Sequence, residues 1–136
     1  MNKLRKYLPI ILIITPIILS SCFFFDPVPE QFRIKIDSAG TPVSLTTNDT
    51  LVIKLYGYIG NDTCYWFHHY QSVREDYSLN LTVWGMHNVA YRKGCPSSQV
   101  YLNGQEYRVY PLYSGVFELN IQQPDGTWLK KNVTVN

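Results

Sequence analysis

The sequence predicts an all-β domain, an antiparallel sandwich of about seven or eight strands in residues 31–136. Three observations support this prediction. Apolar and polar residues alternate with a period of two in most segments of that range. Glycine, proline, asparagine and aspartate separate these segments, as expected for turns. No window has the period of an amphipathic helix.

The first predicted strands lie before residue 62. Residues 32–37 alternate between apolar and polar side chains, and Ser38-Ala39-Gly40 is expected to end this strand. Residues 50–58 repeat the alternation. A turn is predicted next, at Gly57, Gly60, Asn61 and Asp62.

The middle of the chain contains an aromatic strand and a regular one. Residues 64–70 should place Tyr65 and Phe67 on one face and Trp66 and Tyr70 on the other. Residues 77–84 alternate most clearly. Their expected inward side chains are Tyr77, Leu79, Leu81 and Val83. Residues 85–98 form a less regular connection.

The last predicted strands form two hairpins. Residues 100–102 and 105–110 flank Asn103-Gly104, a strong signal for a two-residue hairpin turn, and Pro111 should end the second strand. Residues 116–122 and 128–135 are separated by a turn sequence, Pro124-Asp125-Gly126.

Residues 1–21 have the parts of an export signal, with basic residues at the start and an apolar run at 8–19. The run is shorter than the roughly 20 residues that a membrane-spanning helix needs. The four residues that follow, Leu19-Ser20-Ser21-Cys22, resemble the lipobox of bacterial lipoprotein precursors. The resemblance implies cleavage before Cys22 and lipidation of its thiol with fatty acyl chains such as palmitate. An ordinary secretory signal with an incidental cysteine is the alternative.

Residues 22–30 would then be a short tether that holds the domain close to a bilayer. Two or more acyl chains anchor a protein stably without a membrane span. The membrane is therefore one expected partner, and the bacterial cell envelope is the expected location. Phe23 is not the aspartate that retains lipoproteins, so the outer membrane is favoured if the cell has two membranes.

Charge argues against nucleic acid as a partner. The formal net charge of the whole chain is +2, but three of its twelve cations, Lys3, Arg5 and Lys6, belong to the export signal. The remaining chain has nine basic and ten acidic residues, a net charge of about −1. A nucleic-acid surface would need clustered cations.

Cys64 and Cys95 are predicted to form a disulfide, because Cys22 is assigned to the lipid and exported proteins are oxidised. The alternative is a metal site that also uses His68 and His69. If residues 64–70 form a strand, these two side chains point to opposite faces and cannot both reach one ion. No metal and no cofactor is therefore expected.

The aromatic content is high, and five of these side chains could form a binding surface for a protein or a glycan. They are Tyr65, Trp66, Tyr70, Trp84 and Tyr91. The alternative is that they only fill the faces of the sandwich.

No catalytic motif is found, so no catalytic residue is assigned. The sequence favours a non-enzymatic envelope lipoprotein with a binding or structural domain. An enzyme whose site assembles only in the fold is one alternative. A lipoprotein that inhibits an envelope enzyme through residues 85–98 is another.

The C-terminal part resembles bacterial immunoglobulin-like modules. Gly115 opens the penultimate strand, Phe117 follows it, and Asp125-Gly126 forms the turn before the final strand. The resemblance implies an immunoglobulin-like sandwich. It does not extend to Cys64 and Cys95, whose positions do not match the inter-sheet disulfide of antibody domains.

Overall fold

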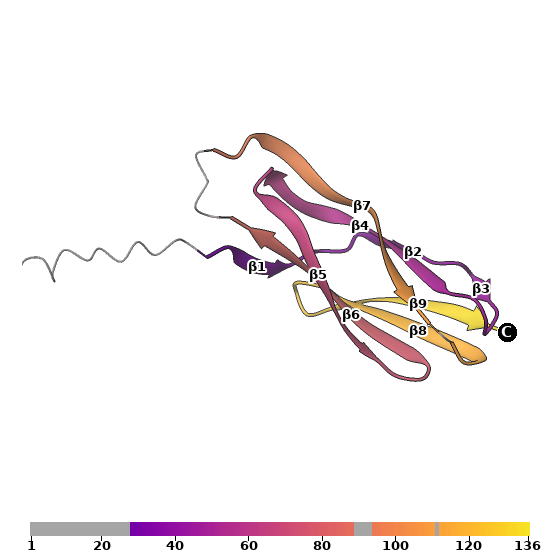
Figure 1. Cartoon of the computed structure of the whole chain (residues 1–136). Coiled ribbons are helices and arrows are strands. Elements are labelled where there is room, and N and C mark those ends of the chain that lie inside the picture. The colour runs from indigo at the N-terminus through magenta and orange to yellow at the C-terminus, as the bar shows by residue number, and fades with distance from the viewer. Residues whose placement is uncertain (1–27, 89–93, 111) are drawn as a thin grey trace, which may run out of the picture.

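The computed structural model describes residues 28–88, 94–110 and 112–136, which form an all-β domain of two sheets (Figure 1). The export signal and the lipobox lie outside these residues. The strands within the described ranges are β1 (Glu30–Arg33), β2 (Ser38–Gly40), β3 (Ser44–Leu45), β4 (Leu51–Asp62), β5 (Tyr65–Arg74), β6 (Ser78–His87), β7 (Ser97–Val109), β8 (Gly115–Gln122) and β9 (Trp128–Val135). No helix in the described ranges has the length and apolar character needed to cross a bilayer.

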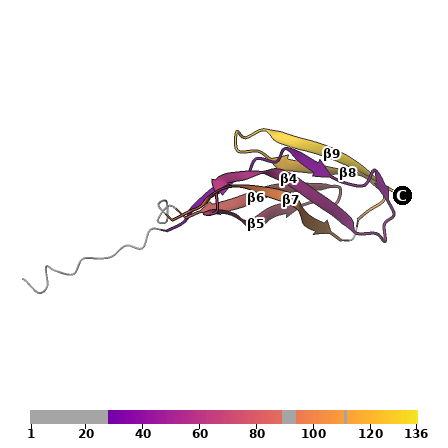
Figure 2. The ribbon, with the colours of Figure 1, turned by 90° about the horizontal axis from the view of Figure 1, so that it is seen from above.

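Strand β6 is the centre of the six-stranded sheet. It pairs with β5 along one edge, and β1 and β8 share its other edge. Strand β9 follows β8, and the short β3 follows β9. The second sheet has three strands in the order β2-β4-β7. Strand β1 begins at one end of the elongated domain, and the C-terminus lies at the other (Figures 1 and 2).

The expectation of a wholly antiparallel sandwich is wrong for two strand pairs. Strands β6 and β8 are parallel, and so are β3 and β9. Between β6 and β8 the chain crosses to the other sheet as β7 and then returns. It therefore enters β8 in the direction of β6. All other pairs are antiparallel in the described structure.

The core lies between the two sheets and follows the predicted alternation. Leu79, Leu81 and Val83 of β6 point inward, as the sequence predicted, but Tyr77 lies before the strand and is exposed. Strands β4 and β8 contribute further fully buried side chains, among them Leu51, Ile53, Leu55, Phe117, Leu119 and Ile121. One cluster thus joins both sheets.

Residues 32–37 were expected to form one strand, but β1 ends at Arg33. The chain then leaves the six-stranded sheet, where the N–H of Ile34 bonds to Val83, and reaches the other sheet, where the N–H of Asp37 bonds to Tyr56. Between them, the N–H of Ile36 donates to the buried Gln123 side chain at 3.0 Å. Residues 38–40, expected to be a break, form β2.

The turn predicted at Gly57 and Gly60 is wrong, because both glycines lie inside β4. A Cβ at Gly57 would lie 2.2 Å from the carbonyl oxygen of Lys35, and one at Gly60 would lie 2.1 Å from Cγ of Tyr65. These glycines therefore provide space for neighbouring segments. The turn itself follows Asp62.

The hairpin predicted at Asn103-Gly104 is also wrong. Strand β7 runs through it without a turn. Asn103 is opposite Tyr56 and Gln105 is opposite Leu55, so Gly104 is an extra residue in a β-bulge. Its φ of 77° requires the left-handed conformation that glycine adopts at such bulges. Both hairpin turns and β-bulges use a glycine in the left-handed conformation, so an Asn-Gly pair in the sequence does not distinguish between them.

Candidate binding face

The three tryptophans of the chain lie on one surface of the domain, the outer face of the six-stranded sheet. Trp84 of β6 alternates with Val83, which points into the core. Trp66 of β5 is opposite Met86 of β6, two residues further along the same face. Trp128 of β9 is opposite Gln122 of β8, which is in turn opposite Thr82 of β6.

We call the part of this surface that surrounds the three tryptophans the tryptophan face. Besides the tryptophans, it contains Gln31, Arg33, His69, Gln71, Asn80, Thr82, Met86, Asn120, Gln122 and Lys130.

The tryptophans form a diagonal across the sheet. A strand spacing of about 4.8 Å and a rise of about 3.3 Å per residue place the Cα atoms of Trp66 and Trp84 about 8 Å apart. The same geometry separates Trp84 from Trp128 by about 12 Å, and the whole diagonal is about 20 Å long. Trp66 is 38% exposed and Trp128 is 43% exposed, so both ends of the diagonal are open to solvent.

Trp84, at the centre, is held by three neighbours. Its indole N–H donates to Oε1 of Gln71 at 3.0 Å. The guanidinium of Arg33 lies 5.4 Å from the ring centroid, within the range of a cation–π contact. The imidazole of His69 lies nearly parallel to the indole, with 6.3 Å between centroids. These contacts fix the orientation of the ring.

Amide side chains flank the diagonal of the tryptophans. Nδ2 of Asn120 donates to Oδ1 of Asn80 at 3.1 Å, and the hydroxyl of Thr82 donates to Oε1 of Gln122 at 3.2 Å. Each amide has both donors and an acceptor, so these pairs leave hydrogen-bonding capacity free.

Two buried polar atoms of this face have no hydrogen-bond partner within the described residues: Nδ1 of His69 and Oδ1 of Asn120. The third such atom in the described structure is Nε2 of Gln123, at the turn before Trp128. Buried polar groups without a partner are rare, because each costs about 1–3 kcal/mol. All three atoms are covered by neighbouring atoms, and the Gln123 side chain is directed towards Ile36, away from the tryptophan face.

Trp66 and Trp84 are the two predicted binding aromatics that lie on this face. Tyr65 does not, because its ring packs towards the core and stacks on His87 at 3.9 Å. The predicted placement of Tyr70 beside Trp66 is wrong, because a β-bulge between Phe67 and His69 turns Tyr70 inward. Its ring lies 4.8 Å from that of Phe67. Tyr91 lies outside the described residues.

Tyr70 instead joins the edges of the two sheets. Its hydroxyl donates to the carbonyl of Glu106 in β7 at 3.2 Å, and the hydroxyl of Tyr107 in β7 donates to Ser72 in β5 at 2.8 Å. Burial raises the pKa of Tyr70 from 10.0 to about 12, the close Tyr107 adds to this, and a hydrogen bond with Gln105 opposes it.

Trp128 was missed as a candidate. It is the first residue of a predicted strand, and the alternation of residues 128–135 alone could have placed it opposite the core. Trp128 lies on the same side of the sheet as Trp66 and Trp84 because the strands are arranged in the order β5-β6-β8-β9. The sequence around Trp128 does not predict this strand order.

The predicted disulfide is confirmed. Cys64 and Cys95 are bonded, with their Cα atoms 5.6 Å apart. In the described part of the chain, the one group of three potential metal ligands is Asp62 with these two cysteines, whose sulfur atoms are already bonded to each other. His68 and His69 are in ring contact at 4.7 Å, but neither belongs to that group.

The disulfide lies at the end of the domain where β1 begins. The N–H of Asn88 bonds to the carbonyl of Cys64, and Glu30 is opposite His87. The irregular connection expected from Gly85 begins later, because β6 continues to His87. Residues 89–93 of that connection lie outside the described residues.

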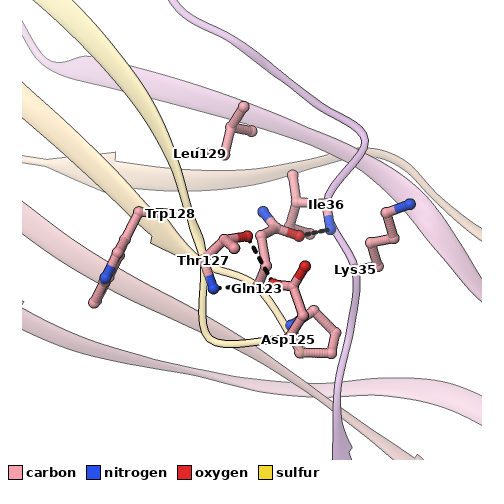
Figure 3. Close-up of a pocket in the computed structure, with 8 residues that line it drawn as sticks. Lys35, Ile36, Gln123, Asp125, Thr127, Trp128 and Leu129 are labelled. Atoms are coloured by element: carbon pink, nitrogen blue, oxygen red, sulfur yellow. Dashed lines mark hydrogen bonds between the residues drawn. The ribbon is translucent and has the colours of Figure 1, made fainter.

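A hollow of about 390 Å³ lies beside the β8–β9 turn, and Trp128 is one of the residues that line it (Figure 3). Its polar side chains include Lys35, Asp125 and Thr127. Asp125 accepts hydrogen bonds from the N–H and the hydroxyl of Thr127 at 2.9 and 2.7 Å, and these bonds lower the pKa of its carboxyl group. The ring of Trp128 lies on the far side of the turn from Lys35 (Figure 3). Asp125 thus has a structural role in the turn.

Comparison of the chain with protein-family models, curated proteins and solved structures finds no match. The functional argument therefore depends on the residues of this chain.

Proposed function

We propose that this protein is a lipid-anchored lipoprotein of the bacterial cell envelope, and that its β-sandwich is a non-enzymatic binding domain. Leu19-Ser20-Ser21-Cys22 is the basis for the anchor. The tryptophan face is the observation that supports binding. Its partner would be a protein or a glycan of the envelope.

The exposure of the tryptophans supports a binding role. Trp66 and Trp128 keep 38% and 43% of their surface exposed on a sheet that already has a complete core on its other side. Tryptophans that are not needed for the core are characteristic of binding surfaces, where they bury a large area with little loss of side-chain entropy.

We infer an immunoglobulin-like sandwich as the finer description of the fold. The hairpin of β8 and β9 supports it, with Gly115 at the start of β8, Phe117 in the core and Asp125-Gly126 in the connecting turn. The parallel pairing of β6 with β8 departs from the antiparallel sheets of such domains.

Lipid anchoring is tested by fractionating cells that express the full chain. We expect the protein in the membrane fraction, and the precursor should accumulate with globomycin, which blocks cleavage at a lipobox. Cys22→Ala should prevent lipidation. A Cys22→Ala protein that is still processed and still fractionates with the membrane would contradict the proposal.

Binding is tested with the lipidated protein immobilised and exposed to solubilised envelope material. Trp66→Ala should abolish capture of the partner. Tyr58→Ala is the matched control, because Tyr58 is 41% exposed on the outer face of the other sheet. Equal capture by both variants would contradict a binding role for the tryptophan face.

A further inference from the structure

We propose that the ligand of the tryptophan face is a neutral carbohydrate chain, bound across the sheet along the diagonal of Trp66, Trp84 and Trp128. This inference rests on the proposed binding function and specifies the chemical class of the ligand. Three features of the face carry it: the spacing of the indole rings, the amides beside them and the small number of charged side chains.

The indole rings suit the apolar faces of sugar rings. A pyranose has C–H groups on its broad sides and hydroxyl groups around its rim. A tryptophan that is open to solvent on one side can stack on the C–H groups, and side chains next to it can form hydrogen bonds with the hydroxyl groups. The contacts of Trp84 with Arg33, Gln71 and His69 hold its ring in a fixed orientation before any ligand arrives. This lowers the entropy cost of binding.

The amides suit hydroxyl groups. Five of the ten other side chains of the face are amides, namely Gln31, Gln71, Asn80, Asn120 and Gln122. A hydroxyl both donates and accepts, and an amide offers both counterparts. The Oε1 atoms of Gln71 and Gln122 accept from Trp84 and Thr82, which leaves the NH2 groups of these two amides to donate to a ligand hydroxyl. A ligand would satisfy groups that the protein leaves unpaired.

The charges favour a neutral chain. Two cations, Arg33 and Lys130, lie near the tryptophans, and the acidic Glu118 is on the same side of β8, two residues from Asn120. Arg33 is already placed over the ring of Trp84. A highly anionic polymer would need several free cations along its path. A protein partner usually docks on a surface with an apolar centre, whereas hydrogen-bonded polar side chains flank these tryptophans.

The length of the diagonal predicts a preference for chains. A single sugar ring contacts one tryptophan, whereas a span of about 20 Å requires several linked rings to reach from Trp66 to Trp128. Affinity should therefore rise with the number of sugar units until the third tryptophan is engaged. When linked sugar rings of one ligand bind several tryptophans, their contributions to the binding free energy add, because translational freedom is lost only once.

The test uses the full lipidated chain in a detergent without a sugar headgroup. Cellohexaose, mannohexaose, xylohexaose and chitohexaose are titrated, with binding measured by calorimetry and by tryptophan fluorescence. We expect at least one hexasaccharide to bind more tightly than its disaccharide. Trp66→Ala and Trp128→Ala should each weaken binding about tenfold or more, because each removes one stacking contact.

Tyr58→Ala and Tyr101→Ala are the matched controls, since they remove exposed aromatic rings from the other sheet. They should leave the affinity unchanged. The carbohydrate inference is overturned if none of the four hexasaccharides binds, or if the tyrosine variants lose affinity as the tryptophan variants do. Capture of an envelope protein that depends on Trp66, without saccharide binding, would overturn this inference and leave the proposed binding function intact.

Discussion

The two outer faces of the sandwich both expose aromatic rings, but they differ in what surrounds those rings. On the three-stranded sheet, Tyr58 and Tyr101 pack edge to face with 5.5 Å between their centroids. The hydroxyl of Tyr101 donates to Gln99 at 2.7 Å, and Arg108 forms an ion pair with Glu106 at 2.7 Å. We call this surface the tyrosine face. Its aromatic and charged groups find partners within the domain.

The tryptophan face pairs several of its groups as well, among them Trp84 with Gln71 and Asn80 with Asn120. Its rings are spread along a diagonal, and Nδ1 of His69 and Oδ1 of Asn120 have no partner in the described structure. Exposure alone does not separate the two faces, because Trp66 at 38% and Tyr58 at 41% are almost equally exposed. Ring packing does separate them, because Tyr58 and Tyr101 contact each other, whereas Trp66 and Trp128 have no aromatic partner within the described residues. This favours the tryptophan face as the binding surface.

The largest expected effect is on the core that supports both faces. Phe117→Ala removes a side chain that is 1% exposed within the core cluster between the sheets. It should lower the free energy of unfolding by about 3–5 kcal/mol, because of the lost burial and the cavity left behind. Urea denaturation measures this loss. A loss below about 1 kcal/mol would contradict the placement of Phe117 in a closely packed core.

Loss of the disulfide should be the next largest effect. Replacing Cys64 and Cys95 together by serine opens a link between residues 31 apart in sequence. The chain-entropy model predicts a loss of about 3–4 kcal/mol in the free energy of unfolding. Because Trp66 is two residues from Cys64, amide hydrogen exchange should accelerate most at the start of β5. Unchanged exchange there would contradict a role for the disulfide in bracing this end of the tryptophan face.

Gly104→Ala tests the tyrosine face alone. Gly104 has a φ of 77°, and a Cβ at this position would approach the hydroxyl of Tyr56 to 3.4 Å. We expect a loss of about 1–2 kcal/mol in the free energy of unfolding, from the cost of the left-handed conformation. Saccharide binding measured by calorimetry should not change. A parallel loss of binding would show that the two faces are coupled.

The smallest effect concerns pH, at the contact between β5 and β7. The pKa of Tyr70 is raised to about 12, so the folded protein keeps its proton where the unfolded chain, with a pKa near 10.0, releases it. This contribution to stability is fully present below pH 10 and is lost as the pH rises towards 12. Tyr70→Phe should make the fall in melting temperature across that window less steep. An identical slope in both proteins would contradict the burial of this phenol.

The sequence predicts the strands well where alternation is regular. Strand β9 has the expected bounds, and β8 and β6 differ from expectation by a few residues. The errors fall at glycines. Gly57, Gly60 and Gly104 were assigned to turns. Gly57 instead makes space for the backbone at Lys35, Gly60 makes space for the ring of Tyr65, and Gly104 forms a bulge. A local pattern does not contain these tertiary contacts.

Only part of the candidate site was predicted, because the rest also depends on tertiary contacts. Trp66 and Trp84 were found because aromatic residues are conspicuous in a strand. The bulge at His68 reversed the expected side of Tyr70, since one extra residue shifts every later side chain to the other face. Trp128 joins the other tryptophans only through the crossover that makes β6 and β8 parallel neighbours. That pairing had no signal in the sequence.

The most direct test of the account is a heteronuclear NMR titration of the full chain with the hexasaccharide that binds most tightly. The chain has three tryptophans, so it gives three indole N–H signals. All three lie on the tryptophan face, and we predict that all three shift together while the signals of Tyr58 and Tyr101 stay in place. Shifts confined to the tyrosine face, or indole signals that do not move, would contradict the assignment of the binding surface.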